Sequence, residues 1–191
     1  MKNLFKTNLK VAFAMLMMAA FVSSCDNNDP EPVNEEELIT TVNLTFTNTA
    51  NSSDVVTASF QDLDGEGGNA PTIDDITLSA NTTYSVAIEF LNEQENPIED
   101  ITEEVAEEDD EHQVFFVASG ANFTYAYNDA DGNGNPLGLN GRATTGAAGS
   151  GTLQVLLLHE PNKTASGVTN GDPSNAGGES DVDITFSLNI Q

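Results

Sequence analysis

The chain has 191 residues, with 31 Asp and Glu against 5 Lys and Arg, and a formal net charge of −26 at pH 7. This length allows one domain, or one domain with a tail. A single cysteine excludes an intrachain disulfide, and the acidic balance would repel a phosphate backbone, so we expect no nucleic-acid partner.

Residues 1–24 are typical of a bacterial lipoprotein signal peptide. Three lysines precede an uncharged apolar run over 11–22, which is shorter than the roughly 20 apolar residues that span a bilayer. The run ends in Val22-Ser23-Ser24-Cys25, which resembles a lipobox, whose cysteine becomes lipidated and then N-terminal. The alternative is an ordinary secretory signal with a coincidental cysteine. We predict that Cys25 is lipidated and anchors the chain in the cell envelope, at the outer membrane (periplasmic or surface face) rather than the inner one.

Residues 25–40 are expected to form a tether behind the lipidated cysteine. The segment is polar, acidic and contains Pro30 and Pro32, which favours an extended conformation. After cleavage only Arg142 and Lys163 would remain as cations against 31 acids. The lipid would hold the protein at the membrane, while this charge would keep the folded part away from anionic headgroups.

From residue 41 onward the pattern is that of β-strands. Apolar and polar residues alternate with period two, which indicates half-buried strands, over 42–47, 55–60, 84–90, 122–128 and 182–190. Runs at 114–118 and 155–158 are apolar on both faces and are candidates for central strands, and 76–78 is a candidate for a short one. With glycine- and asparagine-rich turns between them, seven or eight strands predict an all-β, single antiparallel β-sandwich over 41–191.

Two local features refine this prediction. Residues 78–84, ending in Tyr84, resemble the tyrosine corner of fibronectin type III and related immunoglobulin-like sandwiches. A short acidic helix is expected over 97–108, with Pro97 in its first turn and Ile98, Ile101 and Val105 on one face. Two loops, 129–151 and 161–180, are long for a compact domain, a length more typical of functional or mobile segments.

One candidate metal site lies in the first of these loops. Asp129, Asp131 and Asn133 place oxygen side chains at alternate positions, like the start of a calcium loop, and Asp62 and Asp64 repeat this start. Asn140 stands where an EF-hand would need its bidentate glutamate, so an EF-hand is excluded. The alternative interpretation, that Asp-Gly and Asn-Gly dipeptides form tight turns, is favoured.

The second candidate site involves the only two histidines. His112 follows Glu111 and His159 precedes Glu160, each at an end of an expected strand. If the two strands were antiparallel neighbours, the imidazoles would meet at one end of the sheet, and two histidines with a carboxylate suit zinc. If 112–118, 122–128 and 152–159 formed a simple meander, the histidines would lie at opposite ends. Solvated or hydrogen-bonded histidines are the simpler alternative.

Sequence motifs of catalysis are lacking. The chain has no G-x-S-x-G, S-x-x-K or H-E-x-x-H motif, and its only cysteine is assigned to the lipid. Arg142 and Lys163 could recognise an anion, but in so acidic a chain each is expected to pair with a carboxylate. We therefore expect no enzyme, with an unrecognised hydrolase as a remote alternative.

Several segments resemble a known group of proteins: 91–104, 111–113, 159–163 and 175–179. They are similar to a family of small, acidic, uncharacterised lipoproteins of Gram-negative bacteria, often catalogued under the name type 1 periplasmic binding fold. The resemblance covers most of 35–191 and brings no established catalytic or ligand residues. That name implies two α/β lobes with parallel sheets, whereas the alternation predicts an antiparallel sandwich.

Two functions follow as expectations. The first is a non-enzymatic binding or accessory module at the envelope, with an outer-membrane uptake system or a surface protein as partner. The second is the capture of divalent zinc or calcium by His112, His159 and the acidic loops.

Overall fold

The computed structural model describes residues 37–65 and 67–191. The predicted signal peptide, Cys25 and most of the predicted tether lie outside the described residues. Strands dominate the described chain, and their bounds are β1 Thr41–Asn48, β2 Val55–Gln61, β3 Thr72–Ile73, β4 Ile76–Leu78, β5 Thr83–Asn92, β6 Glu99–Asp100, β7 His112–Ser119, β8 Phe123–Tyr127, β9 Asn140–Thr145, β10 Gly149–His159 and β11 Glu179–Ile190. One helix, α2 (Ile101–Glu107), and two 3₁₀ turns, η1 (Val168–Asn170) and η2 (Pro173–Asn175), complete the described elements.

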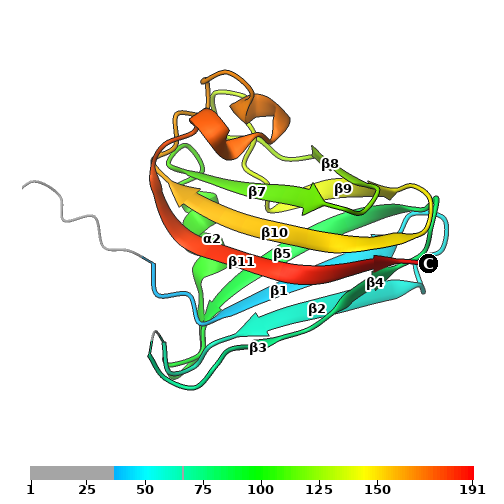
Figure 1. Cartoon of the computed structure of the whole chain (residues 1–191). Helices are drawn as coiled ribbons and strands as arrows, with labels where there is room; N and C mark the ends of the chain where they lie inside the picture. The colour runs from blue at the N-terminus through cyan, green and yellow to red at the C-terminus, as the bar shows by residue number, and fades with distance from the viewer. Residues whose placement is uncertain (1–36, 66) are drawn as a thin grey trace, which may run out of the picture. The chain divides into compact units, whose positions relative to one another are not determined.

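The strands form two sheets that face each other (Figure 1). One sheet has the order β3-β2-β1-β5-β9-β8, with β6 paired to β5, and the other has the order β4-β11-β10-β7. Pairing is antiparallel except between β4 and β11. The predicted all-β antiparallel sandwich is therefore confirmed.

The core lies between the sheets and follows the alternation in the sequence. On β11, Val182, Ile184, Phe186, Leu188 and Ile190 are buried while the residues between them are largely exposed. The same period buries the alternate residues of β5 from Tyr84 to Asn92. A side-chain period of two places one set of residues on the inner face, and this apolar face holds the two sheets together.

A smaller apolar cluster lies on the outer face of the second sheet. The segment 161–178, with its two 3₁₀ turns, folds back over β7 and β10 (Figure 1). There it buries Val168 and Ala176 against Phe115 and Leu158. The long loop predicted over 161–180 ends at Glu179, where β11 begins. This loop packs against the sheet.

The structure corrects three details of the prediction. Residues 129–151 are not one long loop, because β9 and the start of β10 lie in them. The helix is shorter than 97–108: it starts after Asp100, whose side chain accepts the Thr102 amide hydrogen as N-cap, and Pro97 precedes it. β3, β6 and β9 were not expected, so the described residues form eleven strands and not seven or eight.

The contact expected of a tyrosine corner is present. The Tyr84 hydroxyl oxygen accepts a hydrogen bond from the Ser79 amide at 2.9 Å, and the Tyr84 side chain is fully buried. The bond fixes the turn between β4 and β5, which belong to different sheets.

Replacing Tyr84 by Phe is expected to destabilise the fold by about 1 kcal/mol, because the Ser79 amide loses its acceptor while the ring keeps its packing. Urea unfolding followed by far-ultraviolet circular dichroism measures the change. An unchanged free energy of unfolding would show that the corner contributes nothing.

Candidate metal centre

The two histidines face each other across neighbouring strands. β7 and β10 pair antiparallel, and in their register His112 is the direct partner of His159. The intervening β8 belongs to the other sheet, so the simple meander does not form. Of the two arrangements considered from the sequence, the one that brings the imidazoles together is the one observed.

Both side chains point toward the interior at one end of the sandwich. They continue the inward-facing rows of β7, which contains Val114, and of β10, which contains Leu157. His112 is fully buried and His159 is 8% exposed. β10 ends here because Glu160 adopts a left-handed φ of 50° and Pro161 has no amide hydrogen for the ladder.

A third side chain reaches this point through an irregularity in β11. The register places Val182 opposite Leu157 but Ser180 opposite Leu158, so Asp181 is the extra residue of a β-bulge. Bulges re-aim side chains, and the Asp181 side chain is completely buried with Oδ2 3.9 Å from His112 Nε2. The backbone approaches closely beside it, since a Cβ on Gly178 would lie 2.3 Å from the His159 carbonyl oxygen.

The hydrogen bonds of His112 define its tautomer. Nδ1 lies 3.3 Å from the Glu108 carbonyl oxygen, which can only accept, so Nδ1 carries the proton. Nε2 then presents its lone pair to the interior, where it has no hydrogen-bond partner. A histidine that donates one N–H to a backbone carbonyl and offers the other nitrogen is the usual arrangement of a metal ligand.

The two imidazoles are stacked. Their centroids are 4.7 Å apart and their planes differ by 12°. Because each lone pair lies in its own ring plane, nearly parallel rings do not direct both lone pairs at one point. His112 is held through Nδ1, whereas neither ring nitrogen of His159 has a hydrogen-bond partner. For both to bind one ion, His159 is therefore the ring that must rotate.

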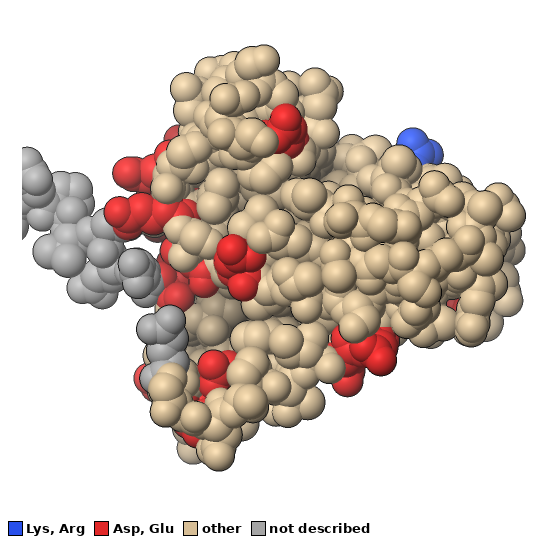
Figure 2. Space-filling view, viewed as in Figure 1, with Lys and Arg blue, Asp and Glu red and all other residues tan. Residues whose placement is uncertain are grey.

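Carboxylates surround the pair. Among the described residues, three groups place one ligand atom from each member within 4.8 Å of the others: His112 with His159 and Asp181, His112 with Glu37 and Glu108, and His159 with Glu111 and Glu160. The exposed acids of α2 and of the turn to β7 lie at the same end, and Figure 2 shows red side chains gathered on that side of the molecule. The local field therefore favours a cation.

The surroundings shift two pKa values. Burial lowers the pKa of His112 below its ordinary value, which keeps the ring neutral and able to bind a metal at neutral pH. Burial, a hydrogen bond with Glu104 and the charges of Glu104, Glu108 and Asp181 raise the pKa of Glu37 to about 7. So much negative charge is gathered here that one carboxyl retains a proton near neutrality.

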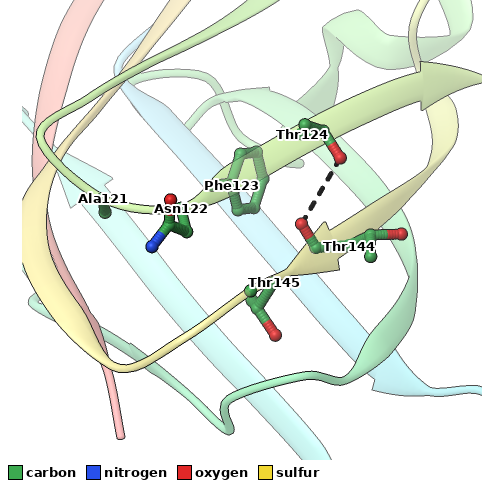
Figure 3. A pocket seen from close by; sticks show the side chains of 7 residues that line it. Ala121, Asn122, Phe123, Thr124, Thr144 and Thr145 are labelled. Carbon is green, nitrogen blue, oxygen red and sulfur yellow. Dashed lines mark hydrogen bonds between the residues drawn. The ribbon is translucent and has the colours of Figure 1, made fainter.

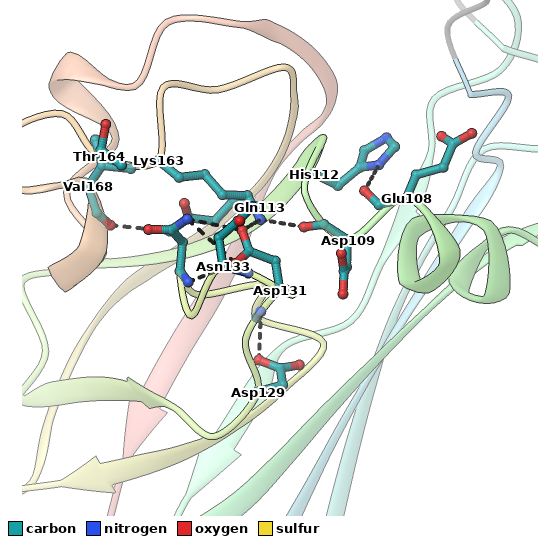
Figure 4. A network of polar contacts seen from close by, with 12 residues as sticks. Glu108, Asp109, His112, Gln113, Asp129, Asp131, Asn133, Lys163, Thr164 and Val168 are labelled. Carbon is teal, nitrogen blue, oxygen red and sulfur yellow. Dashed lines mark hydrogen bonds and ion pairs between the residues drawn. The ribbon is translucent and has the colours of Figure 1, made fainter.

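The loop proposed for calcium uses its oxygens differently. Asp129 accepts the amide hydrogens of Gly138 and Asn140, and Asp131 accepts those of Asn133 and Asn135. Asp131 also pairs with Lys163 Nζ at 3.2 Å, and Lys163 donates to the Asp109 carbonyl oxygen, as Figure 4 shows. Burial alone would raise the pKa of Asp131, but the hydrogen bonds from Asn135, Lys163 and Asn133 outweigh it and lower the pKa. These contacts fit the turn interpretation.

The segment around Asp62 and Asp64, which resembles the start of that loop, also forms a turn. Asp62 accepts the Gly65 amide hydrogen, and Asp64 accepts the main-chain and side-chain amides of Asn69. None of the three clusters found in the described chain contains Asp62, Asp64, Asp129 or Asp131. Calcium binding at these positions remains a sequence prediction.

The surface hollows lie apart from the histidines. One of about 340 Å³ is lined by residues 121–124 and 144–146 at the turn into β8 and the end of β9 (Figure 3). Others of about 420, 320 and 300 Å³ lie beside Tyr127, Thr102 and Asp74. None of these four hollows is lined by His112, His159 or Asp181.

Sequence reasoning found His112, His159, Glu111 and Glu160 but missed Asp181, Glu108 and Glu37. Asp181 precedes a regular alternating strand and only the bulge turns it inward. Glu108 ends the segment expected to be a helix, and Glu37 lies in the segment expected to be a tether. A sequence signal for the last two was absent, because acids are so frequent here that spacing carries no information.

No family model, curated protein or solved structure matches this chain. In the described part of the chain, no helix is both long and apolar enough to span a membrane.

Replacing Lys163 by Met is expected to cost about 3 kcal/mol, because it leaves the Asp131 carboxylate buried without its ion-pair partner. The double variant Lys163→Met with Asp131→Asn should recover part of that loss. Urea unfolding of the single and double variants measures both. Equal destabilisation by the Met variant and the double variant would contradict a buried ion pair.

Replacing Glu37 by Gln removes the carboxyl group whose pKa is raised. Between the unfolded pKa near 4.5 and the folded value of about 7, the folded state holds a proton that the unfolded state has lost. The contribution of Glu37 is therefore greatest at low pH and is lost as the pH rises through about 7. The variant and the natural chain should melt alike near pH 4, and the variant should melt higher at pH 8 in the presence of a chelator. If the melting temperatures of the variant and the natural chain differ by the same amount at every pH from 4 to 8, the raised pKa of Glu37 is contradicted.

Proposed function

We propose that the chain is a non-enzymatic, lipid-anchored metal-binding module of the cell envelope. Its ligand would be a divalent ion of the zinc type, held by His112, His159 and Asp181, which we call the inner site. The observation that carries this proposal is the buried Nε2 of His112. It has no hydrogen-bond partner, faces the Asp181 carboxylate at 3.9 Å and lies beside a second imidazole.

A cation would give the buried His112 nitrogen a partner. A buried nitrogen without one costs about 1–3 kcal/mol. An ion bound there would also lie within reach of the Asp181 carboxylate. Ligand atoms in a tetrahedral zinc site are about 3.4 Å apart, so the 3.9 Å separation needs to close by only about half an ångström.

The donor set favours zinc over calcium. Two imidazoles and a carboxylate suit zinc and its neighbours in the first transition row, whereas calcium takes six to eight oxygen ligands. Three protein ligands leave one tetrahedral position, which Glu37, Glu108 or water could fill. Glu37 and Glu108 form one ligand group with His112.

Binding is supported better than catalysis. His112 and Asp181 are completely buried, and neither histidine lines the hollows described above. A Ser–His–Asp site would also need a hydroxyl on the imidazole nitrogen that is not held by its orienting partner. His112 Nε2 has no hydrogen-bond partner.

The anchor and the partner belong to the same proposal. Lipidation of Cys25 would hold the module at the membrane, and the acidic tether would give it reach. A partner in the envelope, such as an outer-membrane uptake system or a surface protein, would then receive or supply the ion. The sequence features that support this are the lipobox and the charge distribution of the chain.

Zinc added to the purified full chain in detergent is expected to bind saturably and raise the melting temperature. At 100 times its Kd a ligand adds about 2.7 kcal/mol of stability. The variants His112→Asn and Asp181→Asn should each remove the shift, and calcium should not reproduce it. Calorimetry and thermal melting measure binding and stability.

The matched control is Asp183→Asn, which removes one carboxylate from the exposed face of the same strand. It should keep the zinc response. If the natural chain shows no saturable shift, or if Asp183→Asn loses it as fully as Asp181→Asn, the proposed site is wrong.

A further inference from the structure

A second group of ligands lies directly outside the inner site. Glu111, His159 and Glu160 form it, and we call it the outer site. Both glutamates are exposed, with the Glu111 side chain 52% accessible. In the observed conformation His159 Nε2 lies 3.5 Å from the Glu111 carboxylate, so this nitrogen is directed toward the outer group.

The backbone holds the outer group together. The Glu160 amide donates a hydrogen bond of 2.7 Å to the Glu111 carbonyl oxygen, which ties the end of β10 to the turn before β7. The left-handed backbone of Glu160 terminates the strand at this point. The two carboxylates are therefore carried by a fixed pair of backbone segments.

His159 belongs to both sites, and its environment is that of a movable ligand. It is 8% exposed, and neither Nδ1 nor Nε2 has a hydrogen-bond partner. His112, by contrast, is held by the Glu108 carbonyl oxygen. The stacked arrangement also requires a rotation of His159 before both rings can bind one ion.

We propose that the outer site is a metal-binding site of its own, which captures a divalent zinc-type ion at the surface and passes it to the inner site through rotation of the His159 ring. The proposal rests on the proposed function, since it assigns the route by which the inner site is filled. The ion is first bound by the two exposed carboxylates and His159. It then exchanges the carboxylates for His112 and Asp181 while His159 remains bound.

This route solves an access problem. The inner ligands His112 and Asp181 are completely buried, so a hydrated ion cannot meet them directly. At the outer site, exposed carboxylates replace part of the hydration shell while the ion is still at the surface. The exchange changes only ligands and releases water, with no change of oxidation state or covalent bond.

The test is the rate of zinc binding to the full chain in detergent, measured by stopped flow with a chromophoric zinc chelator as competitor. Glu111→Gln with Glu160→Gln should slow association roughly tenfold, while the Kd of the inner site changes much less. His112→Asn should leave a weak, rapidly exchanging site, because the outer ligands remain. The matched control is Glu103→Gln with Glu107→Gln, which removes two exposed charges from α2 outside the three ligand groups.

The outcomes separate the two proposals. Slow association only in the Glu111/Glu160 variant supports the outer site. Unchanged association in that variant, or equal slowing in the control pair, would overturn it, since the acids would then act only through general attraction. If zinc does not bind saturably to the natural chain in a His112-dependent manner, the proposed function itself is wrong.

Discussion

The antiparallel pairing of β7 with β10 determines the chemistry of this molecule. Cross-strand partners have their Cβ atoms about 5 Å apart, so the register that matches His112 with His159 brings two imidazoles into contact without any further device. A shift of one residue would turn a whole row of side chains to the other face. The same row contains core residues such as Val114 and Leu157, so packing of the core fixes the position of the histidines.

The remainder of the cluster is arranged around that pair. The bulge in β11 buries Asp181, and the end of α2 supplies the Glu108 carbonyl that orients His112. The His112 nitrogen that faces Asp181 has no hydrogen-bond partner, and a buried polar atom without a partner costs stability. Its persistence at the end of a core is understandable if a bound cation satisfies it. The raised pKa of Glu37 reflects the same excess of negative charge.

The sequence predicted the architecture because the inner faces are made by regular alternation, which a period of two reveals. It did not predict β9, because two of the buried residues there, Gly141 and Ala143, are small and give no apolar alternation. A Cβ on Gly141 would lie 2.1 Å from the Tyr125 ring. The meeting of the histidines was only one of two alternatives. Its outcome depended on which sheet β8 joins, and local pattern does not specify that choice. Asp181 points inward only because of the β-bulge, and the alternation of apolar and polar residues does not reveal a bulge.

The chain has two clusters of buried polar groups, one at Asp131 and one at the histidines, and they differ in what occupies the carboxylate or nitrogen at their centre. At Asp131 a lysine and backbone amides already occupy the carboxylate, so the group holds two loops together and has little capacity for an ion. At the histidines, the Nε2 atom of His112 has no hydrogen-bond partner. By our proposal, a metal ion has at this cluster the role that Lys163 has at Asp131. A site of this kind responds to its ligand because a buried ligand nitrogen is left available.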